Sequence, residues 1–232
     1  MHNNSSDLMA KNVRLLSNAA EFEALSTGSI QRMRVGIPGA FSVENALAAV
    51  GICSALGMDF PEIAEGLASA AGVCGRAEVV PVGEPYTVMI DYAHSPDSLS
   101  NILKTVRAIA QGRVIVVFGC GGDRDRTKRP VMGRIAECMA DVCVVTSDNP
   151  RTEEPDSIIA DIVAGMKKSN HICIENRREA IGYALDMAKP DDFVLIAGKG
   201  HEMYQEIQHV KHPFDERAVV REHLSGRKGG AV

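Results

Sequence analysis

The sequence predicts an α/β protein in which a Rossmann-like, mostly parallel sheet follows a smaller, partial α/β segment. Two observations support this prediction. After Gly75, short apolar runs of strand length alternate with amphipathic stretches of helical length, as expected for strands joined by helical crossovers. Before Gly75, runs in which apolar and polar residues alternate precede two helical stretches. Ligands of such folds bind at the carboxyl ends of the parallel strands.

The first region, residues 1–74, is expected to contain short strands between residues 8 and 37. A helix over residues 43–56 follows, because apolar residues recur there at helical spacing and Gly57 suits its end. A second helix over residues 61–70 begins with Pro61, which favours a first helical turn.

The second region, residues 75–226, is predicted to be a separate domain, and residues 227–232 a disordered tail. Its first helix is capped by Ser95, with proline and an acid in the first turn, and a later one by Asn176. Strands are expected over residues 86–90, 114–118, 142–146, 172–174 and 193–197, and helices over residues 95–110, 130–139, 155–166, 177–188 and 215–224.

The composition argues against several classes of protein. The net charge is −5, with 45% apolar and 24% charged residues, so we expect neither nucleic acid nor a membrane as partner. The apolar runs are too short to span a bilayer, and the first ten residues contain no secretory apolar segment. The six cysteines form no Cys-x-x-Cys pair. Cys143 and Cys173 are expected to be buried in strands of a cytoplasmic protein that binds no metal.

Two of the loops that follow predicted strands suit a nucleotide or another anion. Asp91 ends a strand and could accept two ribose hydroxyls, or it could be a solvated residue beside a helix cap. The loop over residues 119–129 combines three glycines with four basic residues near its end. It favours an anion site over a flexible turn, although it is no Walker A loop.

Two further loops suit an amino acid. Pro150 restricts Asn149, so Arg151 is expected to project from a stiff turn and to bind a carboxylate in a bidentate manner. Glu202, after Gly198, could pair with an ammonium group. The alternatives are an ordinary surface turn and a helix N-terminus with an acid in its first turn. His209 and His212 lack a third ligand nearby, which favours a solvated loop over a metal site.

Taken together, these segments resemble a known family. DYAHSPDSL, FGCGGDRDRTKRPVMG, TSDNPRTEEP and IAGKGHEMYQ resemble, in order and spacing, the C-terminal domain of the Mur ligases that add 2,6-diaminopimelate to UDP-N-acetylmuramoyl-L-alanyl-D-glutamate. IPGAFSVENALAA and GRAE resemble the closing part of the family's central ATP-binding domain. The resemblance extends from about Asp7 to Leu224.

The resemblance implies an ATP-dependent ligase of peptidoglycan precursor synthesis that forms an amide through an acyl phosphate. It implies ATP and Mg²⁺ as cofactors, and meso-diaminopimelate and the UDP-MurNAc-dipeptide as substrates. Asp-Asn-Pro-Arg is the pattern of diaminopimelate-adding members, with an L-lysine-adding ligase as the alternative. The implied ATP-binding residues are Asn45 (adenine), Arg76 (phosphates), Asp91 (ribose) and His94. The implied diaminopimelate-binding residues are Arg129, Asp148, Asn149, Pro150, Arg151, Gly198 and Glu202.

The chain also departs from the family pattern. None of the 232 residues forms the Gly-x-x-x-x-Gly-Lys-Ser/Thr loop, and the family's UDP-sugar domain, metal ligands and carbamylated lysine are not matched. Phosphoryl transfer depends on that loop and Mg²⁺. We therefore expect no ligase activity from this chain alone, no catalytic residue or metal ligand in it, and a loose central-domain remnant in residues 1–74. A non-catalytic diaminopimelate-binding module and a complementing subunit, docked on a polypeptide carrying the missing domains, are the alternatives.

Overall fold

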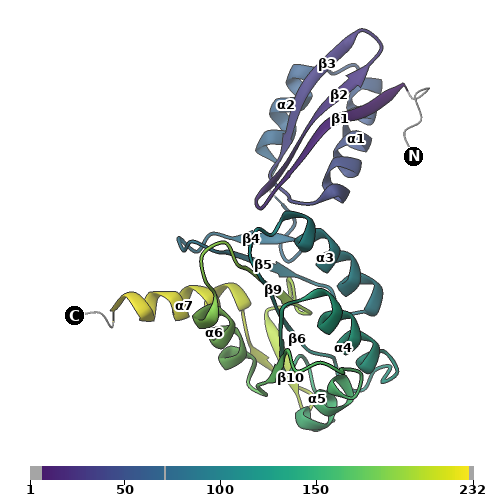
Figure 1. Cartoon of the computed structure of the whole chain (residues 1–232). Helices are drawn as coiled ribbons and strands as arrows, with labels where there is room; N and C mark the ends of the chain where they lie inside the picture. Colours follow the sequence, from purple (N-terminus) through teal and green to yellow (C-terminus); the bar gives the residue numbers. More distant parts are fainter. Residues whose placement is uncertain (1–6, 71, 230–232) are drawn as a thin grey trace. The chain divides into compact units, whose positions relative to one another are not determined.

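The computed structural model describes residues 7–70 and 72–229 and consists of two compact units (Figure 1). They are Met1–Gly72 and Val73–Val232, so the division falls two residues before the predicted boundary. Within the described ranges, no helix is both long and apolar enough to cross a membrane.

The first unit is a three-stranded antiparallel sheet with two helices. Phe22 of the central strand is buried with Met33 of the next strand and Val50 of the following helix, so the unit has a core of its own. The outer edges of the two flanking strands pair with no other strand in the described part of the chain. The elements are β1 (Leu8–Leu16), β2 (Ala19–Ser26), β3 (Ser29–Val35), α1 (Ala40–Ala55) and α2 (Phe60–Ser69).

The second unit is built on a six-stranded sheet with the order β4-β5-β9-β6-β7-β8. All neighbouring strands are parallel except β4, an antiparallel edge strand that the sequence analysis did not identify. The fold class is therefore the one that the sequence predicts. The strands are β4 (Glu78–Val80), β5 (Thr87–Asp91), β6 (Val114–Phe118), β7 (Val142–Val145), β8 (His171–Cys173) and β9 (Phe193–Ala197).

Helices cover both faces of this sheet. Figure 1 shows α6 and α7 on one side and α3 and α4 on the other. Every second side chain of the central strands faces the same helices. Val117 of β6 and Ile196 of β9, for example, pack with Ile181 of α6 and Val220 of α7. The helices are α3 (Pro96–Ile109), α4 (Lys128–Met139), α5 (Pro155–Val163), α6 (Arg177–Met187) and α7 (Glu216–Gly229), and the predicted caps Ser95 and Asn176 both accept backbone N–H groups.

Three local predictions need correction. Residues 209–212, predicted to be a solvated loop, are exposed but belong to the hairpin of β10 (Tyr204–Ile207) and β11 (Val210–Pro213). Cys173 is exposed, because it belongs to the edge strand β8, whereas Cys143 in β7 is buried as predicted. Residues 227–229 belong to α7, where a disordered tail was predicted, and residues 230–232 lie outside the described residues.

A fully buried ion pair joins the two helices on one face of the sheet. The Arg177 guanidinium at the start of α6 donates from Nε and Nη2 to Glu216 Oε1 of α7 at 2.8 and 2.7 Å. Its Nη2 also donates to the Ala197 carbonyl at the end of β9, and its Nη1 to the Ser147 carbonyl after β7. Arg177 therefore ties two strand ends to both helices.

Replacing Arg177 by methionine is expected to lower the free energy of unfolding of the second unit by about 3–5 kcal/mol, because Glu216 is left buried without a partner. Burial raises the pKa of the Glu216 carboxyl, so the loss should shrink as the pH falls and the stranded charge is protonated. Urea unfolding followed by tyrosine fluorescence measures this loss, since all four tyrosines lie in the second unit.

The matched control is Arg178→Met at the next position. Arg178 pairs with Glu222 at 2.6 Å, but both side chains are exposed, so the loss should be about 1 kcal/mol or less. Equal losses in the two variants would show that burial of the Arg177 pair is not what stabilises this face.

Candidate functional site

The carboxyl ends of four parallel strands lie at one edge of the second unit's sheet. The Gly198 N–H after β9 donates to the Asp91 carbonyl of β5, and the Thr146 N–H after β7 donates to the Phe118 carbonyl of β6. The loops of interest from the sequence follow these strands and are therefore neighbours in space.

Asp91 is held by the backbone on both sides of β5. Its carboxylate accepts the N–H groups of Ala77 at 2.7 Å and Ala93 at 2.8 Å. Burial raises the pKa of this carboxyl, and the two N–H groups oppose that rise. The Arg76 guanidinium lies 4.7 Å from the centre of the Tyr92 ring, at a distance suited to a cation–π interaction.

Aromatic rings extend this cluster. The Tyr92 ring lies 4.6 Å from the His94 ring and 4.8 Å from the His201 ring, measured between centroids. Lys128 donates from Nζ to the His94 carbonyl at 2.8 Å. Of the predicted nucleotide residues, Arg76 and His94 thus lie against the Tyr92 ring, and Asp91 precedes Tyr92 in the chain.

A second cluster joins two of the predicted amino-acid-binding residues. Asn149 Nδ2 donates to Glu202 Oε2 at 2.8 Å. Asn149 Oδ1 accepts from Lys199 Nζ at 2.7 Å and from the Glu206 N–H at 2.9 Å. The loops after β7 and β9 are therefore locked together through the Asn149 amide.

Asp148 lies beside this cluster and is also buried. Gly198 has a φ of +124°, and a Cβ atom at this position would lie 2.6 Å from Asp148 Oδ2. A side chain other than hydrogen is thus excluded by both backbone conformation and space. Asp148 Oδ2 has no hydrogen-bond partner among the residues that the structure describes.

Arg151 is held by the loop before α4 and by the β10 hairpin. Its Nη1 donates to the Gly122 carbonyl at 2.7 Å, and its Nε to Glu206 Oε2 at 3.1 Å. The backbone φ of Arg151 is +54°, and its N–H donates to the Glu206 carbonyl. A Cβ on Gly122 would lie 1.9 Å from the Pro150 carbonyl oxygen, so the two loops touch through their backbones.

Arg129 differs from the other predicted residues, because its side chain is fully buried and already paired. Nη1 and Nη2 donate to Glu153 at 3.0 and 2.8 Å, and Nη1 also donates to Asp161 at 2.9 Å. The hydrogen bond from Arg129 lowers the pKa of Glu153 to about 2. The structure therefore leaves no terminal nitrogen of Arg129 open for a ligand carboxylate.

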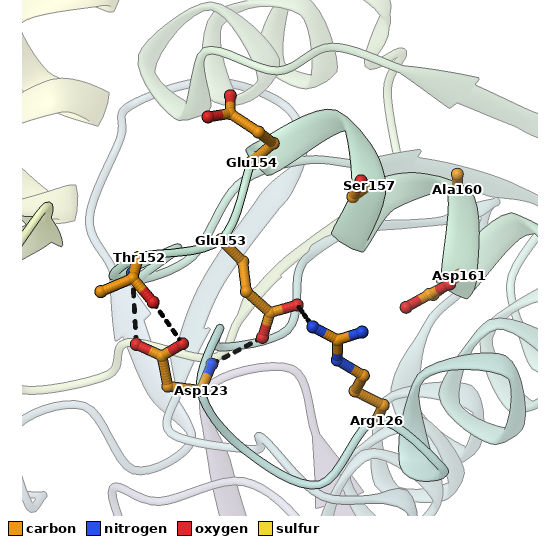
Figure 2. Close-up of a pocket in the computed structure, with 8 residues that line it drawn as sticks. All are labelled: Asp123, Arg126, Thr152, Glu153, Glu154, Ser157, Ala160 and Asp161. Carbon is orange, nitrogen blue, oxygen red and sulfur yellow. Dashed lines mark hydrogen bonds and ion pairs between the residues drawn. The ribbon is translucent and has the colours of Figure 1, made fainter.

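Glu153 and Asp161 border a pocket with a volume of about 560 Å³. Figure 2 shows the side chains that line this pocket. Asp123 accepts from the backbone and hydroxyl of Thr152, and Arg126 pairs with Glu153 at 2.9 Å. None of the predicted site residues lines the pocket, so it is separate from the clusters around Tyr92 and Asn149.

The remaining predicted residue, Asn45, is exposed on α1 of the first unit. Sequence reasoning missed Lys199 and counted Arg124 only among the four basic residues of the predicted anion site. Lys199 lies fully buried in the Asn149 cluster, and Arg124 lies near Arg151, since a Cβ on Gly121 would approach both side chains. Both residues lie in motifs that were singled out for other residues, and a basic side chain in such a motif is the signal that could have identified them.

Comparison with known proteins agrees with this architecture. Residues 75–200 match the family described as Mur ligase, glutamate ligase domain. A Clostridium tetani protein named UDP-N-acetylmuramoyl-L-alanyl-D-glutamate–2,6-diaminopimelate ligase is 48% identical over 219 residues, which are 94% of this chain and 45% of that protein. A Clostridioides difficile protein of the same name is 47% identical and covers 94% of this chain and 46% of its own length.

Solved structures agree as well. One of a protein with the same name is 37% identical, with a TM-score of 0.79, over 97% of this chain and 47% of that one. UDP-N-acetylmuramate–alanine ligase from Thermotoga maritima has a TM-score of 0.64 at 18% identity, over 99% of this chain and 47% of that one, a likeness of fold alone. The chain spans about half the length of the curated relatives it matches. On the match over residues 75–200, more than half of its length, this chain belongs to the Mur ligase family.

Proposed function

We propose that the chain supplies the amino-acid-binding part of an ATP-dependent ligase that joins meso-diaminopimelate to UDP-MurNAc-L-Ala-D-Glu. In that reaction ATP phosphorylates the D-Glu carboxylate, and the amine of the incoming amino acid displaces phosphate to form the amide. The observation that carries the proposal is the pairing of a carboxylate, Glu202, with the Asp-Asn-Pro-Arg turn at one sheet edge. The name shared by the relatives supports the choice of substrate.

Arg151 is the proposed partner of the ligand's second carboxylate. Its Nε and Nη1 are used within the protein, while Nη2 makes no hydrogen bond or ion pair with the described residues. Arg124 is exposed across Gly121 and makes no ion pair within the same residues. We propose that Arg124 joins Arg151 in binding carboxylate, in the role that the resemblance implied for the buried Arg129.

Glu202 is the proposed partner of the ligand's ammonium group. One of its oxygens, Oε2, accepts from Asn149 and Lys199. The other, Oε1, accepts no hydrogen bond in the described part of the chain. L-lysine lacks the second carboxylate and so cannot make the charge-assisted contact that the remaining Nη2 of Arg151 offers. The arrangement therefore favours diaminopimelate over lysine.

Asp91, Arg76 and His94 are the proposed nucleotide-binding residues of the second unit. Asp91 uses its oxygens for two backbone N–H groups, and a carboxylate has lone pairs left for two ribose hydroxyls. Asn45 remains the proposed adenine contact. No group of three or more His, Cys, Asp or Glu side chains in the described residues could hold a metal ion. The proposed roles are therefore those of the chain's own side chains toward ATP.

Arg151→Ala is expected to weaken meso-diaminopimelate binding about tenfold to hundredfold, because a charge-assisted contact is lost. It should also remove most of the preference over L-lysine. Isothermal titration calorimetry of the chain with each amino acid measures both effects. Arg126→Ala is the matched control, since Arg126 is an exposed arginine of the neighbouring loop.

An unchanged preference in Arg151→Ala would contradict the role of this arginine. A preference for lysine in the unsubstituted chain would favour an L-lysine-adding ligase. Heat from neither amino acid, in a chain shown to be folded, would contradict the proposal of an amino-acid-binding part.

Asp91→Asn is expected to weaken ATP binding about tenfold, because a neutral amide accepts hydroxyl hydrogen bonds less strongly than a carboxylate. Nuclear magnetic resonance titration with ATP, following the amides of Ala77 and Ala93, measures this affinity. The control is Asp97→Asn, an exposed acid in the first turn of α3. Equal affinities in the two variants would mean that the ribose is bound elsewhere.

A further inference from the structure

Lys199 is a charged side chain in a place where charge is costly. Its relative exposure is 0%, and an ammonium group is removed from water only at a large free-energy cost unless it is paired. Burial lowers the pKa of Lys199, against the opposing effect of the Asp148 and Glu202 carboxylates. Its Nζ contacts Asn149 Oδ1 at 2.7 Å and Glu202 Oε2 at 3.3 Å.

These contacts determine which way the Asn149 amide faces. Oδ1 accepts from Lys199 Nζ and from the Glu206 N–H, which leaves Nδ2 to donate to Glu202. A flipped amide would set Nδ2 against two donors and Oδ1 against a carboxylate. Without the ammonium group, one of the two donors that oppose the flip is gone.

The same contacts orient Glu202. Oε2 is shared by Asn149 and Lys199, so the carboxylate cannot rotate freely and Oε1 stays in one direction. In formal charges, Lys199 and Arg177 face three buried or half-buried carboxylates, Asp148, Glu202 and Glu216. This layer carries one surplus negative charge, which a ligand ammonium group would balance.

We propose that Lys199 is a positioning residue that holds Asn149 and Glu202 in the orientation in which Glu202 Oε1 receives the ammonium group of an amino-acid substrate. This inference rests on the proposed function, because it assumes that Glu202 contacts the amino acid. Lys199 itself, fully enclosed, touches no substrate.

The test is a double-mutant cycle on the whole chain, with meso-diaminopimelate affinity measured by calorimetry for the unsubstituted protein, Lys199→Met, Glu202→Gln and the double variant. Lys199→Met should weaken binding by about tenfold or more, the effect of a lost charge-assisted hydrogen bond. In the Glu202→Gln background the same change should weaken it by less than about twofold, because residues that act through one contact are not additive.

Lys189→Met is the matched control, since Lys189 is exposed beyond the end of α6, and its affinity should equal that of the unsubstituted chain. If Lys199→Met does not fold, Lys199→Gln replaces it in the cycle, because the shorter amide keeps an N–H donor without the charge. Folding is checked by the urea midpoint from tyrosine fluorescence.

Additive losses, or a lowered urea midpoint with unchanged affinity, would overturn the positioning role and leave Lys199 as a part of the fold. Absence of binding in the unsubstituted, folded chain would overturn the proposed function and this inference together. Unchanged affinity in Lys199→Met, together with weaker binding in Glu202→Gln, would overturn this inference and leave the proposed function in place.

Discussion

The site depends on a layer of buried charge beneath the ends of the parallel strands. Arg177 donates to the carbonyls of Ser147 and Ala197 and to Glu216. It therefore connects the loop after β7, the end of β9 and the start of α7. Buried charges of this kind persist only when they are paired and hydrogen-bonded, so the loops above them have few alternative arrangements.

Close backbone approach adds a second constraint. Gly122 lies against the Pro150 carbonyl, and a Cβ on Gly119 would lie 2.2 Å from the Thr146 carbonyl oxygen. Bulkier residues at these positions would force the loops after β6 and β7 apart. Because Arg151 donates to the Gly122 carbonyl, its direction is set by the same contact between the loops.

Arg124 and Arg129, two arginines of the predicted anion site, show how burial and pairing change the role of a residue. The buried Arg129 is paired with Glu153 and Asp161, two of the residues that line the pocket in Figure 2. Arg124 is exposed and makes no ion pair with a described carboxylate. A guanidinium contributes to ligand binding only where its donors are not already taken, which is why we favour Arg124.

The sequence by itself determined the alternation of strands and helices and the caps Ser95 and Asn176, because spacing and capping chemistry are local. It also predicted which loops face one sheet edge, since parallel strands present their carboxyl ends together. The tertiary structure decided the edge positions of β4 and β8 and the exposure of Cys173. It also decided which basic side chains are buried and paired within the protein. In the sequence, Arg129 and Lys199 cannot be told from exposed basic residues, because their burial and pairing depend on partners 24 and 50 residues away.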